Sequence, residues 1–198
     1  MIQQTALAQD RSWLASSSRR FAVVIGATAF VAICAHISIP LGFTPVPITL
    51  QPFAVLLLGL LLTPSDSFSA LTVYLLEGAA GLPVFSPHGV GGLAHLFGPT
   101  GGYLLAAPFA ACVAGLLYRA FQQRAWAAFA GAAIGDLILL ATGALWLEVL
   151  TRTSFSALLS VSVVPFLASD AAKVLAAAAC ALIFRSFAAR TSSRAQQR

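Results

Sequence analysis

Asp170 and Lys173 lie three residues apart inside an otherwise apolar segment of the chain. A spacing of three puts two side chains on one face of a helix, where opposite charges pair. Each charge alone costs roughly 2.5 to 3.5 kcal/mol at the centre of a bilayer, so such a pair is a candidate functional site. The alternative is an ion pair that only fastens this helix to its neighbours. Small side chains around the pair favour a ligand site, because they leave room for a bound molecule; they are Ala171, Ala172 and Ala176 to Ala179.

Two other acids lie in or beside apolar segments. Asp136 has no base near it in the sequence, so a hydrogen bond between packed helices explains it at least as well as contact with a ligand. Glu77 stands at the end of an apolar segment, just before a long loop rich in glycine and proline. There it reaches either the membrane interface or the rim of a pocket.

Residue patterns for catalysis are missing from the sequence. His36, His88 and His95 lack the spacing of a zinc-binding helix, and no Gly-x-Ser-x-Gly nucleophile motif occurs. The glycine-rich run at residues 98–103 has no lysine, which a phosphate-binding loop requires. We therefore expect a protein that is not an enzyme, uses no cofactor or metal and does not hydrolyse ATP. Its basic residues stand at segment ends and do not alternate with aromatic residues, which argues against nucleic acid as a partner.

The composition is that of a protein surrounded by lipid. Hydrophobic residues make up 59% of the 198 residues and charged residues only 9%, with a mean hydropathy of +0.90. Soluble domains carry roughly 25% charged residues. We predict an all-α integral membrane protein with six transmembrane helices, at residues 21–39, 48–62, 67–80, 101–119, 126–147 and 163–187. This helical domain, residues 21–187, lies between a polar segment at 1–20 and a basic tail at 188–198.

The arginines indicate which way the predicted helices cross the membrane. Six spans put both termini on one side, and cytoplasmic loops carry an excess of arginine and lysine. The side of the termini has nine arginines, against Arg152 alone on the other. We therefore expect cytoplasmic termini in a cell inner membrane, and outward-facing loops at residues 40–47 and 81–100 that cap a pocket. A tight turn is expected at residues 63–66, between the second and third spans.

The first span carries small residues on one face. Ala22 and Gly26 lie four residues apart, and Ala29 follows three residues later. Small residues at such spacings let two helices approach closely. The spacing leaves two partners equally open, another helix of this chain or a second protein.

Three loop motifs occur in order along the chain. They are TPVPITLQ at residues 44–51, GLPVF at residues 81–85 and GPTGGYL at residues 98–104. Together with the Asp-x-x-Lys of the last span, they resemble the BioY family of biotin transporters over roughly residues 20–187. The resemblance implies biotin uptake across the cytoplasmic membrane by the substrate-binding S component of an energy-coupling factor (ECF) transporter.

The resemblance also implies partner proteins. A transmembrane coupling subunit and ATPase subunits would supply the energy for uptake. In the family, an alanine-rich surface of the first helix meets the coupling subunit, which assigns Ala22, Gly26 and Ala29 to that contact. Self-association into a homo-oligomer is left open.

Biotin itself offers three kinds of surface to a binding site. It has a ureido ring with two donors and one acceptor, an apolar ring, and an anionic tail. We expect Asp170 to accept a ureido N–H and Lys173 to donate to the ureido oxygen; the opposite orientation, with Lys173 on the carboxylate, stays open. Further contacts are expected from Gln51, Tyr103, Val84, Phe85 and, at the rim, Glu77.

The loop before GPTGGY departs from the family pattern. Many members carry an arginine in the loop before GPTGGY, whereas this sequence has Val90 and His95 in that stretch. The partner of the biotin carboxylate therefore stays unassigned. Alternatives to biotin uptake are an S component for another small vitamin, a membrane enzyme and a purely structural helical subunit.

Overall fold

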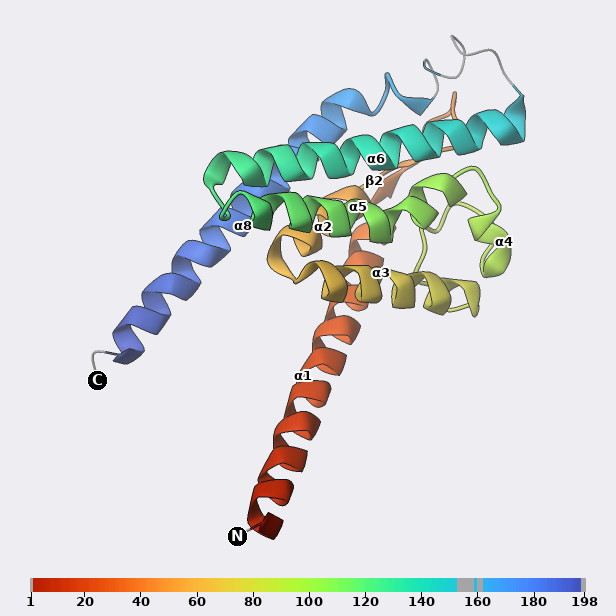
Figure 1. Cartoon of the computed structure of the whole chain (residues 1–198). Helices are drawn as coiled ribbons and strands as arrows, with labels where there is room; N and C mark the ends of the chain where they lie inside the picture. Colours follow the sequence, from red (N-terminus) through yellow and green to blue (C-terminus); the bar gives the residue numbers. More distant parts are fainter. Residues whose placement is uncertain (1, 153–158, 160–161, 197–198) are drawn as a thin grey trace.

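The protein is described from a computed structural model, in which residues 2–152, 159 and 162–196 are placed. The chain is helical, as predicted from its composition. The long helices are α1 (Ile2–His36), α2 (Gln51–Leu61), α3 (Pro64–Ala79), α5 (Gly101–Ala120), α6 (Ala125–Thr151) and α8 (Leu167–Gln196). One helical turn, α4 (Leu93–Leu96), interrupts the long loop before α5. Figure 1 shows α1 and α8 projecting from the same side of the bundle, so that both termini lie there.

Four of these helices are long and apolar enough to cross a membrane. Their spanning segments are Ser18–His36, Gly101–Ala120, Ala125–Thr151 and Leu167–Ala188. The other two predicted spans also form helices, but α2 has 11 residues and α3 has 16. At a rise of about 1.5 Å per residue, neither covers a hydrocarbon core of roughly 30 Å on its own. Crossing by α2 and α3 therefore stays a prediction.

Helices α1 and α8 extend beyond the predicted membrane spans at the two ends of the chain. Helix α1 begins at Ile2 and runs without a break through the polar segment that we placed at residues 1–20. Helix α8 likewise continues to Gln196, past the expected end of the membrane domain at residue 187. Hydropathy detects the apolar part of a helix and not its polar extension, because backbone hydrogen bonds continue regardless of polarity.

The predicted turn between the second and third spans is present. The backbone N–H of Asp66 donates to Thr63 Oγ1 over 3.1 Å, which caps the N-terminus of α3. Pro64 occupies the first turn, where its missing N–H costs nothing. Helices α2 and α3 are thus joined by a short, capped connection.

Glycines let α2 and α5 cross at very close range. A Cβ added to Gly59 would lie 2.5 Å from the carbonyl oxygen of Ala111, and one added to Gly115 would lie 2.5 Å from the carbonyl oxygen of Gly59. Any larger residue would push the two backbones apart. Small residues at helix crossings are typical of membrane proteins, where packing replaces the hydrophobic effect as the force between helices.

Large apolar side chains cover the outside of the bundle. Phe21, Val149 and Phe184 are 69%, 74% and 63% exposed, and they come from α1, α6 and α8. A soluble protein rarely leaves so many large apolar residues in contact with water. The exposed apolar surface therefore agrees with lipid as the surrounding solvent.

The two long loops have structure of their own. Residues 40–47 connect two short antiparallel strands, β1 (Ser38–Ile39) and β2 (Ile48–Thr49), which the all-α prediction did not include. In the loop at residues 81–100, the hydroxyl of Tyr74 donates to the carbonyl of Val84 over 2.9 Å. The indole N–H of Trp146 donates to the carbonyl of Gly98 over 2.9 Å. Side chains of α3 and α6 thus hold both ends of the loop.

Candidate functional site

A cavity lies where the loops meet the ends of the helices. Its empty volume is about 680 Å³, including its open mouth. Residues from β2, α2, α5, α6, α8 and the loop at residues 81–100 line it. Among them are four residues that the sequence predicted as ligand contacts: Gln51, Tyr103, Asp170 and Lys173.

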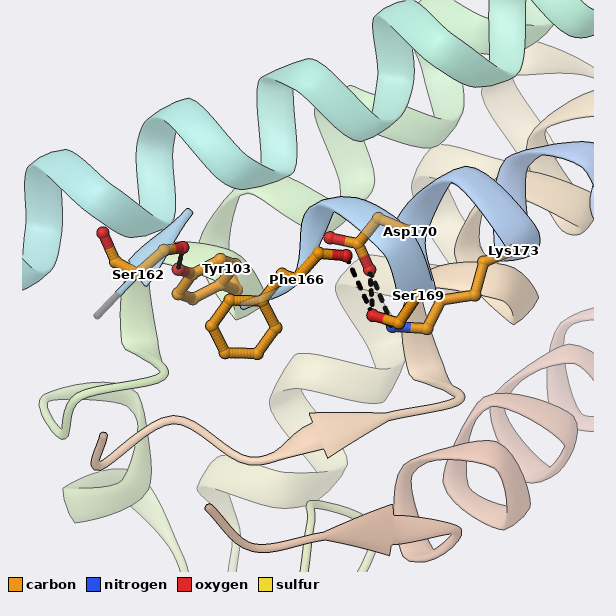
Figure 2. Close-up of polar contacts among 6 residues, drawn as sticks. All are labelled: Tyr103, Ser162, Phe166, Ser169, Asp170 and Lys173. Atoms are coloured by element: carbon orange, nitrogen blue, oxygen red, sulfur yellow. Dashed lines mark hydrogen bonds and ion pairs between the residues drawn. The ribbon is translucent and has the colours of Figure 1, made fainter. Parts of the chain in front are cut away.

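Asp170 and Lys173 form the predicted ion pair. Lys173 Nζ lies 2.7 Å from Asp170 Oδ1, and the two side chains are only 9% and 6% exposed. The hydroxyl of Ser169 lies 3.4 Å from the same carboxylate oxygen and 3.5 Å from the ammonium nitrogen (Figure 2). A buried pair of this kind is stable only when its remaining hydrogen-bonding groups find partners.

The start of α8 supports this carboxylate. Asp170 belongs to the first turn of α8, where the positive end of the helix dipole favours a negative charge. Phe166, just before the helix, is 5% exposed and lines the cavity. Its carbonyl accepts hydrogen bonds from the backbone of Asp170 over 2.8 Å and from the hydroxyl of Ser169 over 2.9 Å. These hydrogen bonds fix the first turn of α8, which carries the charged pair, at the cavity wall.

Tyr103 joins α5 to the segment that precedes α8. Its hydroxyl donates to the carbonyl of Ser162 over 3.1 Å (Figure 2). Its ring lies against α6 at Gly143, where an added Cβ would come within 2.2 Å of the ring. The hydroxyl hydrogen of Tyr103 is thus engaged by the protein, and only its oxygen lone pairs are left for a ligand.

Comparison with known proteins identifies the family. The model of the BioY family matches residues 5–190. The chain belongs to the BioY family. The resemblance inferred from the loop motifs is therefore confirmed.

Related proteins of this family are described as biotin transporters. The chain is 42% identical to the biotin transporter BioY of Thermotoga maritima over 155 residues, which cover 78% of this chain and 89% of the relative. It is 37% identical to a probable biotin transporter BioY of Pyrococcus horikoshii over 149 residues, covering 75% and 85% of the two chains. It is 35% identical to the biotin transporter BioY2 of Lactococcus lactis over 153 residues, covering 77% and 82%.

A solved structure has the same fold. It is the crystal structure of the S component for biotin from an ECF-type ABC transporter. The TM-score is 0.79 at 26% sequence identity, and the match covers 86% of this chain and 93% of the other. The helical arrangement is thus that of a transporter S component.

Three of the predicted contacts of this BioY-family chain lie away from the cavity lining. Phe85 is 5% exposed and packs its ring against Tyr74 and His95, with ring centres 5.4 and 5.1 Å apart. Val84 offers its carbonyl to Tyr74, as described above. Glu77 accepts a hydrogen bond from Thr28 of α1 over 3.3 Å. These residues anchor the loop and α1 to α3, and their direct contact with a ligand stays a prediction.

Several cavity residues were not predicted as contacts. Asp136 is 7% exposed and lines the cavity from α6. An acid in an apolar helix was noticeable in the sequence, but without a charged neighbour nothing showed which way it faces. Ser86, His95 and Thr100 also line the cavity, from the loop at residues 81–100. Loops have no periodicity, so their inward-facing residues give no signal in the sequence.

Small residues of α1 face away from the bundle. Ala22, Gly26 and Ala29 are exposed, and a Cβ added to Gly26 would have no neighbour within 4 Å. The opposite face is buried, with Ala27 and Val31 in the core. Packing against another described helix of this chain therefore does not account for the small residues at these positions.

Proposed function

We propose that this protein binds biotin and serves as the S component of an ECF-type transporter that takes up the vitamin. The buried Asp170–Lys173 pair at the wall of an otherwise largely apolar cavity carries this proposal. Relatives described as biotin transporters and the fold match to an S component for biotin support it. The protein is then a transport subunit and not an enzyme, and ATP hydrolysis belongs to partner subunits.

Unused hydrogen-bonding capacity at the ion pair fits a ureido group. Lys173 has three N–H donors, and the structure engages two of them, with Asp170 Oδ1 and Ser169 Oγ. One donor is left for the ureido oxygen. Asp170 Oδ2 has no partner among the described residues, so it is available to accept a ureido N–H. Lys173 and Asp170 can therefore bind the ring together without breaking their own contact.

The proposed setting is the inner membrane, with both termini in the cytoplasm. The arginine distribution supports this orientation, and the placement of both termini on one side of the bundle agrees with it (Figure 1). In this setting the loops at residues 40–47 and 81–100 face outward, and the shorter α2 and α3 complete a bundle of six membrane helices. Biotin then enters the cavity from the outside.

The exposed small face of α1 is the proposed contact for the coupling subunit. Ala22, Gly26 and Ala29 are exposed there, and small residues permit a close approach of a partner helix. Replacing Gly26 by leucine should leave biotin binding unchanged and lower uptake and co-purification with the coupling subunit. Replacing exposed Phe21 on the same helix by leucine is the matched control and should change neither.

A vitamin panel tests the proposed substrate. Purified protein, freed of any vitamin that came with it, is titrated with biotin, riboflavin and thiamine in a calorimeter. The proposal expects tight binding of biotin alone. Binding of another vitamin in place of biotin, or no binding by a sample that unfolds cooperatively, would overturn it.

A further inference from the structure

Two sets of polar groups that differ in charge line the cavity. Asp136 on α6 and the Asp170–Lys173 pair on α8 belong to helices, and we call these residues the helix pole. Ser86, His95 and Thr100 belong to the loop at residues 81–100, and we call them the loop pole. A ligand with a polar ring and an anionic tail can use both sets.

The helix pole is a poor site for an anion. The single positive charge of Lys173 is already matched by Asp170 at 2.7 Å. Asp136 adds a second acid to the same wall. With Asp170 ionised, the side chains of this pole therefore sum to no net positive charge, and a carboxylate placed there would face like charge in a medium of low dielectric constant.

The loop pole contains hydrogen-bonding groups that the protein leaves unused. The hydroxyl oxygen of Ser86 is buried and has no hydrogen-bond partner among the described residues. Buried polar atoms without partners are rare and costly, so one at a cavity wall points to a ligand. Thr100 is the N-cap residue of α5, yet its side chain makes no capping hydrogen bond.

His95 has one ring nitrogen engaged and one left over. Its Nδ1 lies 3.0 Å from the carbonyl oxygen of Val90, so this nitrogen carries a hydrogen, because a carbonyl only accepts. Within the described part of the chain, Nε2 has no partner. The side chain is 5% exposed and lines the cavity. When protonated, His95 donates from Nε2 and brings a positive charge.

The loop that carries the loop pole adds no negative charge of its own. Residues 80–100 contain no aspartate or glutamate. The 20-residue helix α5 begins at Gly101, beside Thr100, and the N-terminus of a helix carries a partial positive charge and free N–H groups. The orphaned hydroxyl of Ser86, the free ring nitrogen of His95 and the N-terminus of α5 at Thr100 thus belong to residues that line the same cavity.

We propose that Ser86, His95 and Thr100 form the subsite for the carboxylate of the transported molecule, and that His95 makes this contact in its protonated form. The inference rests on the proposed function, and it fixes the orientation of the ligand: the ureido ring at the helix pole and the tail at the loop pole.

The contact makes ligand binding depend on pH. Burial lowers the pKa of His95, and the hydrogen bond to Val90 partly opposes this shift. The residues that touch the ring, Phe85 and Gly89, carry no charge. The titratable groups of the surrounding elements are Tyr74 and Glu77 on α3, His88 in the loop, Tyr103 on α5, Asp136 on α6, and Asp170 and Lys173 on α8.

The sign of the pH dependence follows from whether His95 holds its extra proton in the free or in the ligand-bound protein. Burial favours the neutral form of His95 in the free protein by lowering its pKa, whereas a bound carboxylate favours the protonated form. Binding therefore takes up a proton. Affinity for the carboxylated ligand should rise as the pH falls toward the pKa of His95 in the free protein and should level off below it.

Calorimetry with two ligands tests the subsite. Biotin and its methyl ester, which has a neutral tail, are titrated into the wild type and into His95→Gln, Ser86→Ala and Thr100→Val between pH 5.5 and 8. The wild type should prefer the acid to the ester by about tenfold or more at pH 5.5 and by less at pH 8. His95→Gln should remove both the preference and its pH dependence. Ser86→Ala and Thr100→Val should reduce the preference and keep its pH dependence.

Two control variants separate the subsite from the proposed function. His88→Gln, an exposed histidine of the same loop, should behave as the wild type. Asp170→Asn should weaken the binding of the acid and of the ester by the same factor, since both ligands carry the ureido ring.

Each failure has its own signature. No binding of biotin by the folded wild type overturns the proposed function. Binding of biotin with the same affinity as the ester, or a preference that survives in His95→Gln at all pH values, overturns the subsite alone. If His95→Gln fails to fold, two other results test the subsite. A wild-type preference for the acid that does not change with pH, or an unchanged preference in Ser86→Ala, then overturns it.

Discussion

Helix α8 and the loop at residues 81–100 line the same cavity, but different forces position their side chains. In α8 the backbone satisfies its own hydrogen bonds, and the helical period alone brings Asp170 and Lys173 to one face. The loop depends on side chains from elsewhere, namely Tyr74, Trp146 and the ring of His95 against Phe85. The geometry of the helix site therefore depends on residues close together in sequence, whereas the geometry of the loop site depends on contacts with distant segments of the chain.

The largest effect is expected from breaking the pair on α8. Asp170→Ala leaves Lys173 as an unpaired buried charge and should lower the free energy of unfolding by about 3–5 kcal/mol. The double variant Asp170→Ala/Lys173→Met should recover most of this stability in a thermal unfolding measurement, because no buried charge is left. Biotin binding should be lost in both. A stable double variant that still binds biotin would show that the pair only fastens helices together.

A smaller effect is expected from displacing the loop anchor. A Cβ added at Gly78 would lie 2.0 Å from the ring of Phe85, so Gly78→Ala should push this ring and the loop out of place. Overpacking of this kind costs about 1–3 kcal/mol. We expect a lower melting temperature and a weaker affinity for biotin. Gly26→Ala is the matched control, since its Cβ would have no neighbour within 4 Å, and equal effects of the two changes would contradict the loop account.

Removing one hydrogen bond of the loop should have a milder effect. Tyr74→Phe leaves the carbonyl of Val84 without its donor and keeps the ring packing. The expected loss is about 1 kcal/mol, felt more in biotin affinity than in the melting temperature, because the loop opens locally. Hydrogen exchange should show faster opening of the loop and unchanged protection of α8. Equal loosening of both would mean that the two regions are not independent.

The smallest effect is expected at Tyr103. Its hydroxyl is engaged by Ser162, so Tyr103→Phe should cost about 0.5–1.5 kcal/mol of stability and weaken biotin binding only a few-fold. Calorimetric titration measures this change. A loss of affinity of a hundredfold or more in a stable variant would instead assign Tyr103 to direct contact with the ligand, as its place in the GPTGGYL motif suggests.

The contrast between α8 and the loop at residues 81–100 also separates what the sequence predicts from what it does not. The ion pair of α8 and the capped turn at Thr63 were predictable, because each depends on residues within four positions of one another. The loop motifs identified the family, although their residues turned out to differ in role: Gln51 and Tyr103 line the cavity, whereas Val84 and Phe85 hold the loop. Roles in a loop depend on contacts between distant segments, which spacing along the chain does not encode.

The helix termini show a second limit. Helix α1 extends back to Ile2 through residues that are too polar for the membrane yet favourable for a helix. Asp136 shows a third limit, because the direction in which its side chain points depends on how α6 is rotated against the neighbouring helices. The cavity wall it joins is assembled from elements that lie far apart in sequence, so its composition emerges only in the fold.

Biotin titration of two isosteric variants tests the central claim, that the cavity beside the α8 pair binds biotin. Asp170→Asn alters an acid of the cavity wall, and Glu148→Gln alters an acid of α6 that does not line the cavity. The account predicts that Asp170→Asn weakens binding by at least tenfold and that Glu148→Gln binds as the wild type does. Unchanged affinity in a folded Asp170→Asn protein would contradict it.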